Sequence, residues 1–175
     1  TTSARSPVSP TGTATWSLKR SSRGPFLATP DLTLSATFAE RAAEFTHGAT
    51  LQAERGDRAA QGHILQSLCV GLELAFKAFL VAHGRSDDWN RREIHHDLAK
   101  AAAAATELGL AAPTPAVTRL IETVGPAYAR HGLDELSALD IGLPEAARLV
   151  DGQLATIFAA LADPPTRNPS GGAAT

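Results

Sequence analysis

The apolar residues of this chain recur at three- and four-residue intervals, which is the spacing of amphipathic α-helices, and there is almost no strand pattern. This spacing predicts five helices, over residues 35–54, 59–83, 96–108, 116–131 and 144–162. Gly84, Gly109 and Gly132 mark the ends of three of them, because glycine readily takes the left-handed conformation that closes a helix. Short connections between about five helices predict an all-α, up-and-down bundle.

The two ends of the chain have a different composition from its centre. Residues 1–33 are rich in Ser, Thr, Pro and Gly and predict a flexible arm, whereas residues 163–175 follow a proline stop and predict a disordered tail. We therefore place the folded domain at residues 34–162. The arm lacks the continuous apolar run of a secretory signal, so we expect a cytoplasmic protein with no membrane association.

Composition narrows the possible chemistry further. Hydrophobic residues make up 43% of the 175, enough for one packed core, and the single cysteine, Cys69, excludes a disulfide framework and a multi-cysteine zinc site. Residues 34–162 carry 11 basic and 16 acidic side chains. An acidic body is unsuited to tight non-specific binding of nucleic acid, so any RNA site would have to be a local patch.

The second predicted helix is apolar on nearly all sides, as expected for a helix at the centre of a bundle. Glu73 and Lys77 lie in its middle, which argues against a membrane span. They are four residues apart with the acid first, the better order for an ion pair. Either the pair joins neighbouring helices, or it lines a polar pocket in which Lys77 faces an anionic ligand.

The residues before and after the end of the second predicted helix form a recognisable pattern. The segment LELAFKAFL (residues 72–80), Gly84 and HDL (residues 96–98) give the arrangement E-x-x-x-K-x-x-L…G…H-D-L, and YAR follows at residues 128–130. Across residues 60–131 the chain resembles the HEPN-like helical proteins of prokaryotes. The resemblance implies a helical bundle, commonly a homodimer, encoded in defence or toxin–antitoxin systems; the alanine-rich composition is typical of a bacterium of high GC content.

Two kinds of activity follow from the resemblance. Some HEPN-like proteins are metal-independent endoribonucleases with an Arg-x(4–6)-His motif, in which histidine moves a proton and arginine stabilises the phosphate charge. Arg91 and His96 fit this spacing, as do the pairs Arg41–His47 and Arg58–His63. Other members act as binding or partner subunits, with a nucleotidyltransferase or an antitoxin as partner.

The neighbouring histidines His95 and His96, with acidic residues nearby, also raise the question of a metal site. Adjacent histidines on a helix rarely reach the same ion, so we expect no metal and no cofactor. Asp97, at the start of the third helix, is expected to accept hydrogen bonds from free backbone N–H groups.

The sequence thus favours a HEPN-like accessory or binding module that engages RNA or a nucleotide. The residues expected to bind are Glu73, Lys77, Asp97 and Arg130, together with the region of His96. The alternatives are a metal-independent endoribonuclease with Arg91 and His96 as catalytic residues, and a structural dimerisation domain.

Overall fold

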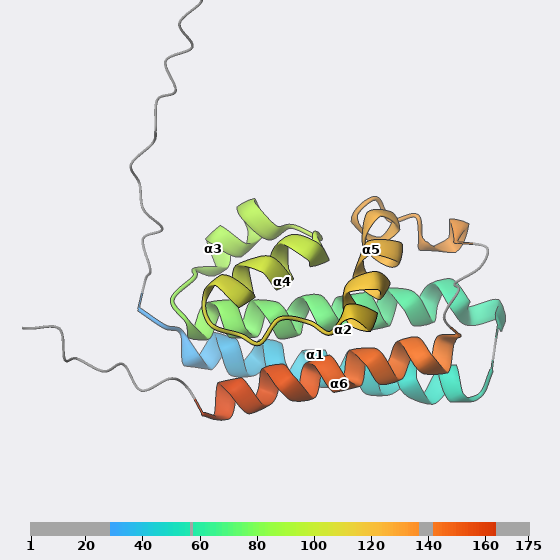
Figure 1. Cartoon of the computed structure of the whole chain (residues 1–175), viewed down its shortest axis with the longest axis horizontal. Helices are drawn as coiled ribbons and strands as arrows, with labels where there is room; N and C mark the ends of the chain where they lie inside the picture. Colours follow the sequence, from blue (N-terminus) through green and yellow to red (C-terminus); the bar gives the residue numbers. More distant parts are fainter. Residues whose placement is uncertain (1–28, 57, 137–141, 164–175) are drawn as a thin grey trace, which may run out of the picture.

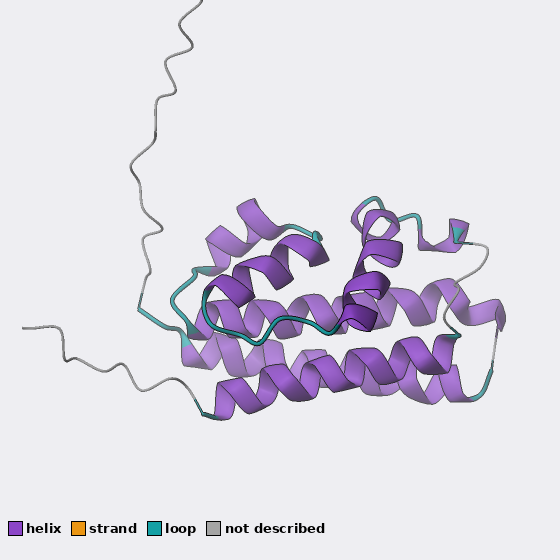
Figure 2. Cartoon of the chain, in the orientation of Figure 1, coloured by secondary structure: helices purple, strands orange, loops and turns teal. Residues whose placement is uncertain are grey.

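The computed structural model describes residues 29–56, 58–136 and 142–163, which form helices joined by loops, with no strand among them (Figure 2). The helices are α1 (Leu32–Glu54), α2 (Gln61–Ala82), α3 (Asp87–Trp89), α4 (Leu98–Glu107), α5 (Pro115–Ala129) and α6 (Leu143–Ala162). Short 3-10 turns at Arg58–Ala60 and Leu133–Glu135 and a π-helical turn at Asn90–Ile94 complete them. The predicted all-α class is confirmed, and the part of the chain that the structure describes contains six α-helices.

The helices form two groups that differ in helix length. In Figure 1 the long helices α1, α2 and α6 run alongside one another, and the shorter α3, α4 and α5 lie on the other side of α2. α2 packs against α1, α4, α5 and α6, as its apolar faces predict. The architecture is therefore a helical bundle in which one central helix is covered from two sides.

The first helix begins before residue 34, the predicted start of the folded domain. α1 begins at Leu32, because Asp31 caps it and accepts a hydrogen bond from the N–H of Leu34 at 2.9 Å. Apart from residues 29–33 and Asp163, the predicted arm and tail lie outside the described residues.

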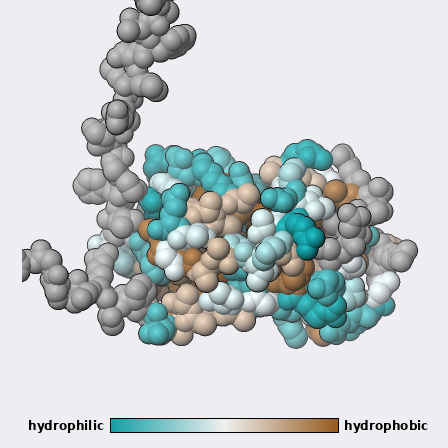
Figure 3. All heavy atoms as spheres, in the orientation of Figure 1, coloured by the Kyte–Doolittle hydropathy of each residue, from teal (hydrophilic) through white to brown (hydrophobic). Residues whose placement is uncertain are grey.

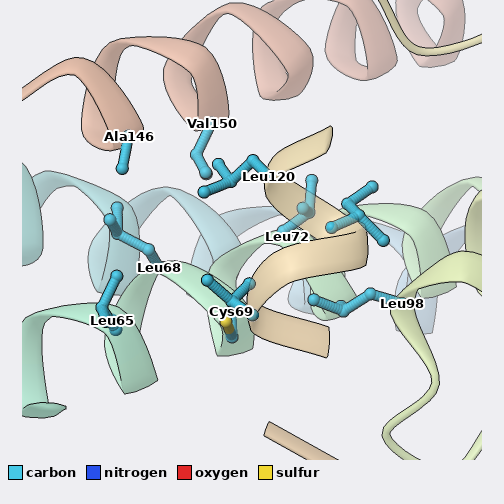
Figure 4. Close-up of a pocket in the computed structure, with 10 residues that line it drawn as sticks. Leu65, Leu68, Cys69, Leu72, Leu98, Leu120, Ala146 and Val150 are labelled. Atoms are coloured by element: carbon cyan, nitrogen blue, oxygen red, sulfur yellow. The ribbon is translucent and has the colours of Figure 1, made fainter. Parts of the chain in front are cut away.

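The core is almost entirely aliphatic where α2 meets α4, α5 and α6. Leu65, Leu68, Cys69 and Leu72 of α2 face Leu98, Leu120 and Val150 across it (Figure 4). The space left between these side chains is a cavity of about 10 Å³. One water molecule needs about this much room, so the aliphatic core is closely packed here.

The surface mixes polar and apolar residues, as Figure 3 shows for one face. Among the described residues, the large hydrophobic side chains that stay exposed are Leu32, Phe45 and Leu51, all on α1. One described helix, α2, is long and apolar enough to cross a membrane by length and composition alone, but 72% of that stretch is buried inside the protein. Core helices of soluble proteins pass the same test, so this finding is weak evidence of a membrane span.

Candidate functional site

A buried carboxylate at the centre of α2 organises the polar residues of the domain. The Glu73 side chain is 7% exposed and accepts from three donors. Lys77 Nζ lies 2.5 Å from Oε1, Tyr128 Oη lies 2.6 Å from Oε2, and His96 Nδ1 lies 2.9 Å from Oε2. We call these four residues the Glu73 cluster. It joins α2 to α5 and to the turn before α4, and it satisfies a charge that would otherwise be costly to bury.

The ion pair between Glu73 and Lys77, predicted from their i,i+4 spacing, is confirmed. Lys77 is largely buried and its ammonium contacts Glu73. This geometry corresponds to the architectural interpretation of the pair, in which the lysine neutralises its own helix neighbour.

The cluster also changes the acidity of its neighbours. Burial, then the hydrogen bond to Glu73 and its negative charge, raise the pKa of the Tyr128 hydroxyl above its ordinary value. Burial, reinforced by Glu73, raises the pKa of the Cys69 thiol to about 12. Cys69 is therefore a protonated, buried thiol at neutral pH, as expected for a packing residue.

His96 is the member of the cluster that reaches the surface. Its side chain is 47% exposed, and its ring meets those of Tyr128 and His131 edge-on, with centroids 5.5 Å apart in both cases. Because Nδ1 is held by Glu73, the second ring nitrogen, Nε2, is left for an external partner. A carboxylate that fixes one imidazole nitrogen and leaves the other free is a chemically competent arrangement for proton transfer or anion binding.

Backbone strain is concentrated around His96. Among the described residues, the non-glycine residues with positive φ are His95, at 51°, and His131, at 58°. His95 closes the π-helical turn and directs the chain into α4, which places His96 beside Glu73. Residues with a side chain seldom adopt this conformation, and such strain gathers at functional sites.

The fourth predicted helix, expected to end at Gly132, ends earlier, at Ala129. His131 itself takes the left-handed position, and the N–H of Gly132 donates to the carbonyl of Ala127 at 2.8 Å. Glycine fills the equivalent positions after α2 and α4, at Gly84 and Gly109. The chain thus places a histidine where glycine is the easier choice, and its ring contacts His96.

The structure separates the remaining predicted site residues. The Asp97 carboxylate caps α4 as predicted, accepting from the N–H of Lys100 at 2.9 Å. Arg91 is 74% exposed and pairs with Asp87 at 2.8 Å, while the exposed Arg130 donates to the carbonyl of Pro126 at 2.9 Å. Within the described part of the chain, no hydrogen bond or ion pair joins Arg91 or Arg130 to the Glu73 cluster.

Sequence reasoning had not assigned site roles to Tyr128 and His131. Tyr128 is the only tyrosine in the chain and falls at the end of the segment that resembles HEPN-like proteins, which was the available signal. His131 offered no such signal, because its importance depends on a backbone angle. The described residues contain no group of three or more His, Cys, Asp or Glu side chains that could hold a metal ion.

Comparison of the chain with protein-family models, curated proteins and solved structures finds no match. The resemblance to HEPN-like proteins accordingly stays a prediction.

Proposed function

We propose that this domain is a HEPN-like module that binds RNA or a nucleotide, in a prokaryotic defence or toxin–antitoxin setting, and that His96 contacts a phosphate group. The observation that carries the proposal is the His96 ring, half-exposed, with Nδ1 held by the buried carboxylate of Glu73. When this imidazole carries a second proton, Nε2–H donates to a phosphate oxygen as a charge-assisted hydrogen bond.

The surroundings of His96 support a small anion site. The His131 ring packs against the His96 ring. Arg130, the residue before His131, has an exposed guanidinium. The guanidinium of Arg130 adds a positive charge to an otherwise acidic domain. A site of this size neutralises few phosphates, so the affinity should fall only gently as salt concentration increases.

The test is fluorescence anisotropy with a short labelled single-stranded RNA and, separately, a labelled adenine nucleotide. We expect wild-type protein to bind at least one probe and His96→Ala to bind at least tenfold more weakly. His47→Ala, which removes an exposed histidine from α1, is the matched control and should bind like wild type. The proposal is wrong if wild-type protein binds neither probe, or if folded His96→Ala binds as well as wild type.

A second candidate function, metal-independent cleavage of RNA, is favoured by the same Glu73–His96 contact, because a carboxylate-oriented imidazole can act as a general base. Incubation of RNA with the protein in EDTA tests it. Loss of cleavage in His96→Ala with retention in Arg91→Ala would make His96 the catalytic residue without the Arg-x4-His motif; loss in both would support the motif.

A further inference from the structure

We propose that Arg85 forms a second, separate binding site for a phosphate group, between the end of α2 and α3. Arg85 is only 8% exposed, and its guanidinium carbon lies 4.5 Å from the centroid of the Trp89 ring. Arg85 precedes α3, whereas His96 follows the π-helical turn, so the two residues flank this helical segment in the sequence.

Arg85 is a buried cation without a counter-ion in the described part of the chain. It forms no ion pair with a described carboxylate, and its buried Nε has no hydrogen-bond partner. The acidic residues next in sequence are already engaged, Asp87 with Arg91 and Asp88 with Arg92. Residues 1–28 and 164–175, which lie outside the described residues, contain no Asp or Glu.

The local structure does not replace a counter-ion. The carbonyl end of the α2 dipole and the face of Trp89 both favour a positive charge, but neither supplies an acceptor for the guanidinium donors. Glu73, the buried acid of the same domain, has three partners. The contrast indicates that an acceptor from outside the chain completes the Arg85 site.

The geometry of the Arg85 guanidinium indicates which kind of acceptor would bind. The guanidinium of Arg85 lies over the Trp89 ring, and its planar fork matches two oxygens of one phosphate group. One residue further on, Asn90 is fully buried and neither atom of its side-chain amide has a partner. The segment therefore contains further unused hydrogen-bonding capacity. Inorganic phosphate and the phosphate of a nucleotide share the chemistry that this site recognises.

The experiment uses the full chain carrying Trp16→Phe, which leaves Trp89 as its only tryptophan. Tryptophan fluorescence is followed while sodium phosphate is added, with sodium chloride at equal ionic strength as the reference. We expect a saturable change with phosphate and none with chloride. Arg85→Lys should weaken binding at least tenfold because the fork is lost, and Arg85→Met should abolish it. Arg92→Met, which removes an exposed arginine of the same segment, should bind as the parent does.

A saturable response retained in folded Arg85→Met, or an equal response to phosphate and chloride, would overturn the proposal. If circular dichroism finds Arg85→Met unfolded, Arg85→Lys decides: unchanged affinity refutes the site and reduced affinity supports it. Adenosine monophosphate then distinguishes the source, since tighter binding than phosphate assigns a nucleotide and equal binding assigns the free ion. Because His96 does not enter this titration, failure here leaves the proposed function standing, and the reverse also holds.

Discussion

Glu73 illustrates why a buried charge can be tolerated in an aliphatic core. Its two oxygens receive a lysine, a tyrosine and a histidine, so the cost of removing the carboxylate from water is offset by three charge-assisted contacts. Removing the acid would leave the Lys77 ammonium buried without a partner.

We predict that Glu73→Ala lowers the free energy of unfolding by about 3–5 kcal/mol, the usual cost of breaking a buried ion pair. Urea denaturation followed by circular dichroism measures it. Glu93→Ala is the matched control, because the Glu93–Lys100 pair at 3.4 Å is half-exposed and should contribute less than about 1 kcal/mol. Equal losses in both variants would contradict the assigned role of Glu73.

Tyr128 provides a direct optical test, since it is the only tyrosine. Its pKa is raised in the folded state, so its contribution to stability is complete below the ordinary tyrosine value near pH 10 and is lost as the pH rises beyond it. We expect no tyrosinate absorbance at 295 nm at pH 10 while the fold persists, and ordinary titration in guanidinium chloride. A midpoint near pH 10 in folded protein would exclude the buried hydrogen bond to Glu73.

At His131 we predict opposite effects on stability and on binding. His131→Gly relieves the positive φ of 58°, which should raise the free energy of unfolding by up to about 1 kcal/mol, although it removes the ring that contacts His96. Thermal unfolding and RNA anisotropy on the same sample provide the two readouts. Greater stability with unchanged RNA affinity would show that the ring has no part in binding.

At the scale of the elements, the contact between α1 and α2 depends on a missing side chain. A Cβ on Gly71 would overlap Thr46 Oγ1 and lie 3.1 Å from the carbonyl oxygen of Ala42. We predict that Gly71→Ala lowers the free energy of unfolding by about 1–3 kcal/mol through overpacking. Gly152→Ala, in α6 with no atom within 4 Å of its Cβ, should instead raise it by about 0.5–1 kcal/mol. Chemical denaturation of both variants compares them, and a neutral Gly71→Ala would mean that the helices can separate locally.

The sequence predicted the long helices because each has an apolar stripe of helical period, and their observed ends lie close to the predicted ones. It did not predict the helical segment at residues 87–94, which has no such stripe. Local polar contacts stabilise this segment: Ser86 caps it, and Asp87–Arg91 and Asp88–Arg92 form i,i+4 pairs along it. The acid-then-arginine spacing was the signal that could have found it.

The candidate site was predictable only in part, for a similar reason. Glu73 and Lys77 were recognisable as charges inside an apolar helix, and Asp97 as an acid at a helix start. The approach of Tyr128 to Glu73 joins residues 55 positions apart, and no local pattern encodes that distance. Arg85 is also invisible to local patterns, since an arginine after a helix-ending glycine is ordinarily exposed.

For the whole molecule, the position of α2 predicts the order in which the fold opens. α2 is covered by α1 and α6 on one side and by α4 and α5 on the other. Hydrogen exchange read by mass spectrometry should therefore find, among the described helical segments, the slowest amides in α2 and the fastest in residues 87–97, whose contacts are mostly polar and exposed. Exchange in α2 as fast as in α4 would contradict its central position.

The burial of α2 also has a consequence for biosynthesis. The ribosome releases residues 61–82 while α4, α5 and α6, which cover much of this helix, are still unmade. Only α1 is then available to shield a segment apolar enough to pass for a membrane span. The nascent chain therefore exposes apolar, aggregation-prone surface until α6 has been synthesised. A chaperone would contribute most to the yield of native protein during this period.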